Sequence, residues 1–125
     1  MIAFDSNVLI YFLEKDPVFW KKAEDIFLKI ESSGGICSSL AITEVMYGTI
    51  NSVDKITPLL SLRVSVVPVS ASIASLAGKI KMAQGLKNID AIHIATALAS
   101  GAKDFVTNDQ ELLKKSFPGL KIHGL

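Results

Sequence analysis

Four carboxylates are the side chains of this sequence best placed to do chemistry: Asp5, Glu44, Asp90 and Asp109. Asp5 and Asp109 each follow a short apolar run and precede a helical pattern. A lone Asp at such a place is explained as a helix cap, because it accepts hydrogen bonds from the first N–H groups. Two of them at corresponding strand ends also favour a shared site.

The other two acids lie within apolar helical patterns. Glu44 is in the middle of "LAITEVMYG", and Asp90 is in the first turn of "NIDAIHIATALASG". A mid-helix Glu is usually exposed to solvent, and an Asp in a first turn interacts favourably with the helix dipole, by about 0.3–1 kcal/mol. Both helices are apolar around most of their circumference, so an acid at a buried margin would need a cation or strong hydrogen bonds.

A cluster of these four carboxylates would have a specific use. Like charges close together raise one another's pKa values, and a divalent cation compensates them. Mg²⁺ and Mn²⁺ both take oxygen ligands, and Mg²⁺ commonly takes one or two carboxylates with water and phosphate oxygens. A bound cation also lowers the pKa of a water molecule. The pattern therefore indicates hydrolysis of a phosphodiester without a Cys or His nucleophile.

Short β-like runs alternate with helical patterns along the chain. The predicted strands cover residues 2–4, 36–38, 65–69, 105–107 and, less regularly, 121–123. Apolar residues at helical spacing predict helices over 23–30, 73–80 and 91–98, and shorter ones over 40–47 and 56–62. Pro17 is expected to open the helix after Asp16, and Gly101 to follow the end of another.

This alternation predicts a single α/β domain over residues 1–125. Strands separated by helices pair in parallel through right-handed crossovers. We expect a three-layer α/β/α domain with a central, mostly parallel sheet of four to five strands. Functional groups in open α/β sheets gather beyond the carboxyl ends of the strands, where Asp5 and Asp109 fall.

Composition narrows the class of protein. The chain has 13 basic and 12 acidic residues, so placing four acids in one site leaves an excess of five positive charges elsewhere, which would suit a polyanion. An ordinary mixed surface explains the same numbers. Cys37 is the only cysteine, which we interpret as a small buried apolar residue. We expect a cytoplasmic protein without a secretory signal or a membrane span.

Three motifs resemble the PIN-domain nucleases, especially the small VapC-type toxins of prokaryotic toxin–antitoxin pairs. They are "MIAFDSNVLIYFL", "SSLAITEVMYG" and "LKNIDAIHIATALASGAKDFVTNDQELL", and the resemblance extends over essentially the whole chain. It implies that Asp5, Glu44, Asp90 and Asp109 ligate Mg²⁺ or Mn²⁺, with Ser6, Asn7, Thr107 and Asn108 in supporting positions. Ser6 replaces the Thr common in that family and keeps the hydroxyl group.

The same resemblance implies a metal-dependent endoribonuclease that acts as the toxin of a toxin–antitoxin pair. Its partners would be an RNA substrate, a cognate antitoxin and a second copy of the chain. Two alternatives stay open: a nuclease of the same fold that processes RNA or acts on DNA, and a non-catalytic scaffold that binds RNA or protein. The complete set of four acids argues against the scaffold.

Other residues have both a functional and a structural interpretation. His93 follows Asp90 by three residues and could contact substrate, although an exposed or hydrogen-bonded structural His is the simpler interpretation. Lys79, Lys81 and Lys87 could bind phosphates or form a solvated face.

The run Val18, Phe19 and Trp20, with "ITPLLSL" further along, predicts an apolar surface on which an antitoxin helix docks. Local packing explains it equally well.

Overall fold

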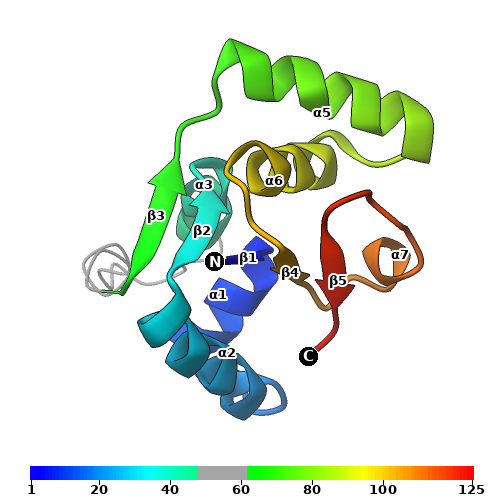
Figure 1. Ribbon diagram of the computed structural model, residues 1–125. Helices are drawn as coiled ribbons and strands as arrows, with labels where there is room; N and C mark the ends of the chain where they lie inside the picture. Colours follow the sequence, from blue (N-terminus) through cyan, green and yellow to red (C-terminus); the bar gives the residue numbers. More distant parts are fainter. Residues whose placement is uncertain (48–61) are drawn as a thin grey trace.

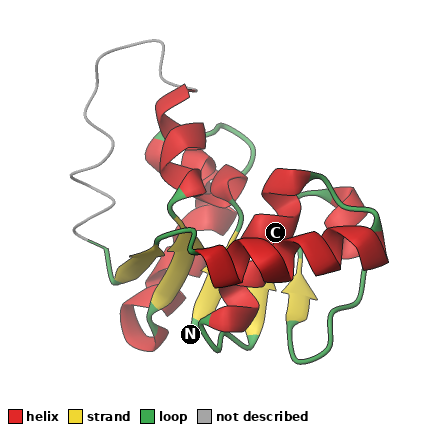
Figure 2. Cartoon of the chain, turned by 90° about the horizontal axis from the view of Figure 1, so that it is seen from above, coloured by secondary structure: helices red, strands yellow, loops and turns green. Residues whose placement is uncertain are grey.

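A single parallel sheet organises the computed structural model, which describes residues 1–47 and 62–125 (Figure 1). The strands are β1 (Ile2–Phe4), β2 (Gly35–Ser38), β3 (Val64–Val67), β4 (Asp104–Val106) and β5 (Lys121–His123). They are arranged in the order β3-β2-β1-β4-β5, and every neighbouring pair is parallel. Figure 2 shows these strands side by side from a second direction.

The helices connect the strands and cover both faces of the sheet. They are α1 (Ser6–Leu13), α2 (Trp20–Ser33), α3 (Leu40–Tyr47), α5 (Ala71–Gln84), α6 (Asn88–Ala99) and the short α7 (Gln110–Leu113). One apolar core lies between the sheet and α5 and α6, and contains Ala3, Phe105 and Ile94. A second core, with Phe4 and Val106, lies between the opposite face and α1, α2 and α3. The predicted three-layer α/β/α architecture is therefore confirmed.

Alternation along β1 and β4 explains how both faces are filled. Ala3 and Phe4 are both buried, but they belong to different cores because successive side chains of a strand point to opposite faces. Phe105 and Val106 divide in the same way. Central strands with two covered faces have no polar side, and their short apolar runs follow from that.

The sheet is more regular than predicted, since all of its strand pairs are parallel, and the strands begin and end within two residues of their predicted bounds. Gly101 has a left-handed φ of 76° just after α6, as expected for a residue that stops a helix. The helix predicted over 56–62 lies outside the described residues, apart from its last position.

The second helix begins later than predicted. Regular helix starts at Trp20, not at Pro17. The side chain of Asp16 accepts hydrogen bonds from the N–H groups of Val18 and Phe19, at 2.9 and 2.8 Å. Asp16 therefore holds residues 17–19 in turns, and its carbonyl accepts the first helical hydrogen bond from Trp20 at 2.9 Å.

Strand register places two predicted site segments next to each other. Phe4 at the end of β1 pairs with Val106 at the end of β4. The following residues, Asp5 and Thr107, therefore leave the sheet as neighbours at its carboxyl edge. This edge is where ligands bind in open α/β sheets.

Candidate active site

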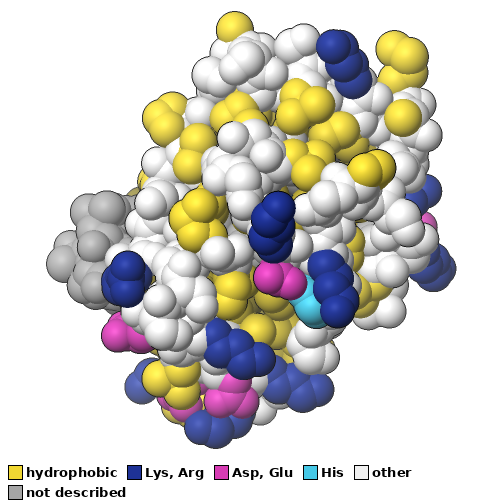
Figure 3. All heavy atoms as spheres, viewed as in Figure 1, with side chains coloured by type: hydrophobic (Ala, Val, Ile, Leu, Met, Phe, Trp, Pro, Cys, Tyr) yellow, Lys and Arg dark blue, Asp and Glu magenta, His cyan; other side chains and the backbone are white. Residues whose placement is uncertain are grey.

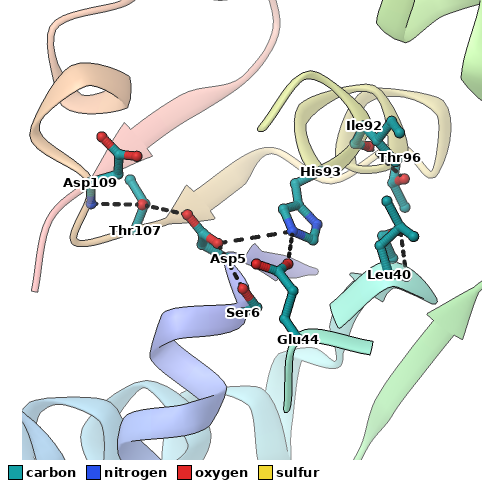
Figure 4. Close-up of polar contacts among 10 residues, drawn as sticks. Asp5, Ser6, Leu40, Glu44, Ile92, His93, Thr96, Thr107 and Asp109 are labelled. Atoms are coloured by element: carbon teal, nitrogen blue, oxygen red, sulfur yellow. Dashed lines mark hydrogen bonds and ion pairs between the residues drawn. The ribbon is translucent and has the colours of Figure 1, made fainter. Parts of the chain in front are cut away.

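Asp5 is a buried carboxylate that does not cap the helix it precedes. It occupies the N-cap position of α1, but its side chain accepts no hydrogen bond from a backbone N–H group of that helix. Its two oxygens accept hydroxyl hydrogens instead, Oδ1 from Ser6 at 3.3 Å and Oδ2 from Thr107 at 3.0 Å (Figure 4). Asp5 is only 6% exposed. Capping therefore does not explain this acid, whose side chain is turned toward the edge of the sheet.

Asp109 is the N-cap residue of α7, as Asp5 is of α1, but its side chain does act as a cap. Its Oδ1 accepts the N–H of Glu111 at 2.8 Å, at the start of α7. Its own N–H donates to the Thr107 hydroxyl oxygen at 3.0 Å. Thr107 thus accepts from Asp109 and donates to Asp5 at the same time. One buried hydroxyl group connects the two acids across β1 and β4.

Glu44 reaches this region from α3 through a histidine of α6. His93 Nε2 lies 2.8 Å from Glu44 Oε1 and 4.0 Å from Asp5 Oδ1. The Glu44 side chain is 31% exposed, whereas the His93 side chain is 1% exposed. Figure 4 shows His93 pointing from its helix toward both carboxylates. Glu44 is therefore a partly buried acid with an imidazole partner.

The pKa values of Glu44 and Asp90 are shifted in opposite directions. Desolvation by itself would raise the pKa of Glu44, but hydrogen bonds from His93 and Ser6, with the charge on His93, outweigh it and lower that pKa. Desolvation raises the pKa of Asp90, and the charges of Asp5 and Asp109 raise it further. His93 and Lys87 only partly oppose this rise.

The electrostatic effect of Asp5 and Asp109 on the pKa of Asp90 indicates that the three acids lie near one another. Asp90 is in the first turn of α6, one turn before His93. Because carboxylates raise one another's pKa only when close, Asp90 shares its surroundings with Asp5 and Asp109. The structure thus brings all four predicted acids to one edge of the sheet.

The supporting residues have different surroundings. Ser6 and Thr107 both donate to Asp5. The Asn108 side chain donates to the Tyr11 hydroxyl at 3.1 Å, which connects the loop before α7 to α1. The Asn7 Oδ1 atom is buried and has no hydrogen-bond partner among the described residues. Of the four, only Ser6 and Thr107 have a side chain bonded to one of the acids.

The donor set fits an oxygen-binding cation that keeps part of its water shell. No group of three His, Cys, Asp or Glu side chains within residues 1–47 and 62–125 is close enough to hold a metal ion by itself. Mg²⁺ usually binds one or two carboxylates and retains several water molecules, so it does not need such a cage. Desolvation raises the pKa of Asp90 most, and a nearby divalent cation would relieve the further rise that the charges of Asp5 and Asp109 cause.

The sequence pattern did not predict that His93 contacts one of the four acids. Its hydrogen bond agrees with the structural interpretation, but it is buried rather than exposed, and its partner is one of the four acids. The only local signal is its spacing of three residues from Asp90. Glu44 is 49 positions away, so the pairing depends on where the sheet places the ends of α3 and α6.

Of the three lysines considered for phosphate binding, Lys81 has a structural contact, and the charge of Lys87 partly opposes the rise in the pKa of Asp90. Lys81 donates to the Asn88 side chain at 2.6 Å, which joins α5 to the start of α6. On the face seen in Figure 3, basic side chains are scattered rather than gathered into one patch.

Burial of Cys37 raises its thiol pKa to about 12, in agreement with a buried structural residue. No helix in the described part of the chain is long and apolar enough to span a membrane.

Comparison with solved structures identifies the same fold in toxin–antitoxin proteins. VapBC2 from Rickettsia felis, bound to a promoter DNA fragment, has a chain that is 23% identical with a TM-score of 0.74, over 99% of this chain and 98% of that one. A toxin–antitoxin complex from Klebsiella pneumoniae is 22% identical with a TM-score of 0.77, over 96% and 95%. The Mycobacterium tuberculosis toxin VapC20, which cleaves the sarcin–ricin loop, is 15% identical with a TM-score of 0.77, over 97% and 99%.

No protein of curated function matches the sequence. The family model of the PIN domain, in contrast, matches residues 2–118. This match spans nearly the whole chain and includes all four acids at the edge of the sheet. The chain therefore belongs to the PIN domain family.

Proposed function

We propose that the protein is a metal-dependent endoribonuclease. The observation that carries this proposal is the cluster of acids at the carboxyl edge of the sheet, where Thr107 bonds to both Asp5 and Asp109 and His93 lies near both Asp5 and Glu44. Binding of a phosphate by these residues alone would be opposed by their negative charge. A cationic partner between the carboxylates and a phosphodiester removes that conflict.

In this proposal Asp5 and Asp90 are the direct ligands of Mg²⁺ or Mn²⁺. Asp109 holds a cation or its water through the carboxylate oxygen that does not cap α7. Glu44 supports a water ligand or takes part in proton transfer. The cation, when bound, polarises a phosphoryl oxygen and lowers the pKa of water. Ser6 and Thr107 keep Asp5 oriented by donating hydrogen bonds to its two oxygens.

The proposed biological context is the toxin of a type II toxin–antitoxin pair in the cytoplasm. It is supported by the shared fold of the Rickettsia felis and Klebsiella pneumoniae proteins, which are described as toxin–antitoxin systems. The cleavage of an RNA loop by VapC20 suggests the class of substrate. The cognate antitoxin would keep this chain inactive.

The surface proposed for the antitoxin lies along α1 and α2. Val18 is 73% exposed, whereas Phe19 stacks on Tyr11 with ring centroids 4.8 Å apart and Trp20 is partly buried. Local packing thus accounts for Phe19 but not for Val18. A nearby groove of about 590 Å³ is lined by Phe12, Glu24, Phe27, Leu28, Glu31 and Leu62. Its apolar walls and two acids suit an amphipathic helix with basic residues.

A homodimer is the remaining part of the proposal. Two large apolar side chains near the α5–α6 connection are exposed, Met82 at 87% and Ile89 at 44%. Apolar side chains also gather over α5 and α6 on the face shown in Figure 3. An exposed apolar patch of this kind is expected at a contact between subunits.

Cleavage of a panel of cellular RNAs by purified, antitoxin-free protein tests the catalytic proposal. Reactions would contain Mg²⁺, Mn²⁺ or EDTA, with Asp5→Asn as the inactive variant. Asp104→Asn is a matched control, because it changes an acid that contacts His123, not the four-acid site. We expect discrete cuts that require metal, persist in Asp104→Asn and disappear in folded Asp5→Asn.

The two alternatives predict different results in the same experiment. A scaffold without catalysis would bind RNA but give no cuts in either metal, and calorimetry would detect no Mn²⁺ binding. A processing nuclease would cut, but its expression in cells would not arrest growth, and co-expression of a neighbouring gene would not change its activity.

A further inference from the structure

A buried histidine outside the predicted set of acids forms a hydrogen bond with one of them. His93 lies in α6 with its side chain 1% exposed, while Glu44 lies in α3 with its side chain 31% exposed. The Nε2–Oε1 distance of 2.8 Å is that of a good hydrogen bond. The His93 ring is therefore held in place by the surrounding core, whereas the Glu44 carboxylate can reach solvent.

The direction of the hydrogen bond follows from the surroundings of the ring. Nε2 faces a Glu44 oxygen at 2.8 Å and an Asp5 oxygen at 4.0 Å. A carboxylate only accepts hydrogen bonds, so Nε2 carries the hydrogen and donates it. Nδ1 is buried and has no partner among the described residues.

Without the hydrogen bond from His93, the Glu44 side chain would favour a rotamer that points into solvent. Its side chain has several rotatable bonds and gains entropy when it is released into solvent. The Asp5 carboxylate contacts the same imidazole, so its negative charge repels Glu44 from nearby. His93 bonds to Glu44 Oε1, and the Ser6 hydroxyl group also stabilises the Glu44 carboxylate.

We propose that His93 is a positioning residue that holds Glu44 at the four-acid site, an inference that rests on the proposed function. His93 does not bind the cation in this scheme. It fixes one carboxylate oxygen so that the other is presented to a cation or its water ligand. Partners of metal ligands commonly contribute 10- to 100-fold to metal affinity or activity.

The competing explanation is that His93 only ties α6 to α3. Two substitutions at the position separate these roles. His93→Gln retains an N–H donor at a similar distance from the backbone, and His93→Leu fills similar space without a donor. Thr96→Val is a matched control on the same helix. Thr96 is buried and donates to the Ile92 carbonyl at 2.7 Å, away from the acids.

Three measurements would be made on each purified variant: Mn²⁺ affinity by calorimetry, kcat and KM for a cleaved RNA, and the crystal structure without metal. We expect His93→Leu to lose about 10- to 100-fold in Mn²⁺ affinity or in kcat, with a smaller change in KM. Its Glu44 side chain should rotate toward solvent. His93→Gln should stay within a few fold of the wild type and keep Glu44 in place.

Two results would overturn the inference. One is a Glu44 side chain that stays in position in the His93→Leu crystal structure. The other is an equal loss of function in His93→Leu and Thr96→Val. Failure of the proposed function has a different signature, namely a wild-type protein that neither binds Mn²⁺ nor cleaves RNA. The crystal structures decide the position of Glu44 in that case as well.

Discussion

Thr107 donates its hydroxyl hydrogen to Asp5 Oδ2 at 3.0 Å, although the two residues are 102 positions apart in the sequence. The same hydroxyl oxygen accepts the N–H of Asp109 at 3.0 Å. Thr107 is completely buried, so water does not replace either bond. A single side chain therefore sets the relative position of two of the four acids.

Replacing Thr107 should weaken both the fold and the proposed metal site. Thr107→Val keeps the shape of the side chain but leaves a buried carboxylate oxygen and an N–H group without this partner. We expect the free energy of unfolding to fall by about 1–3 kcal/mol. Mn²⁺ affinity should fall by roughly 10-fold or more. Urea denaturation and calorimetry measure the two effects.

Thr107→Ser is the control for that change, because it retains the hydroxyl group and removes only a methyl group. Its Mn²⁺ affinity should remain close to that of the wild type. If the Ser and Val variants bind Mn²⁺ equally, the hydroxyl group does not organise the acids.

Asp90→Asn should stabilise the metal-free protein at neutral pH. The pKa of Asp90 is raised above its ordinary 3.8 in the folded state, so between these two values the folded protein holds a proton that the unfolded chain releases. Stability therefore falls as the pH rises through this interval, and the full penalty is present at neutral pH. Thermal unfolding in EDTA should show a Tm a few degrees above wild type.

The advantage of Asp90→Asn should shrink as the pH is lowered toward 3.8, where the wild-type carboxyl is also protonated. Mg²⁺ should raise the Tm of the wild type more than that of the variant, because Asp90 is one of the proposed ligands of the cation in the folded protein. Asp25→Asn, at an exposed position of α2, provides the comparison. An advantage independent of pH would show that repulsion among the acids is not its source.

Tyr11→Phe should separate the two contacts of that side chain. The variant keeps the stack on Phe19 but loses the hydroxyl that accepts a hydrogen bond from Asn108. We expect a loss of about 0.5–1.5 kcal/mol in the free energy of unfolding. Tyr11→Ala, which also removes the ring stack, should lose clearly more in urea denaturation. Equal losses would mean that the stack with Phe19 contributes nothing.

Cys37 should be unreactive in the folded protein. It is 2% exposed, and burial raises its pKa to about 12, so the reactive thiolate is scarce at pH values well below that. Labelling with a thiol reagent at mildly alkaline pH should be at least about 100-fold slower than in denaturant. Fast labelling of the native protein would show that β2 opens readily to solvent.

Local sequence patterns were sufficient to predict most of the helices and all of the strands of this protein. Apolar spacing predicted the helices that became α2, α5 and α6, because a helix beside a sheet must bury one face. Short apolar runs predicted all five strands for the related reason that a parallel sheet is covered on both faces. The placing of Asp5 and Asp109 at one edge followed from parallel pairing.

Contacts between distant segments decided what those acids do. Asp5 and Asp109 look alike in the sequence, yet only Asp109 caps its helix, because the strand register places Thr107 beside Asp5. The pairing of His93 with Glu44 depends on how the sheet places α6 and α3, which cover opposite faces, at the same edge. Periodicity reports which face of an element is buried, whereas the partner of a buried polar group is set by register and helix packing across the whole chain.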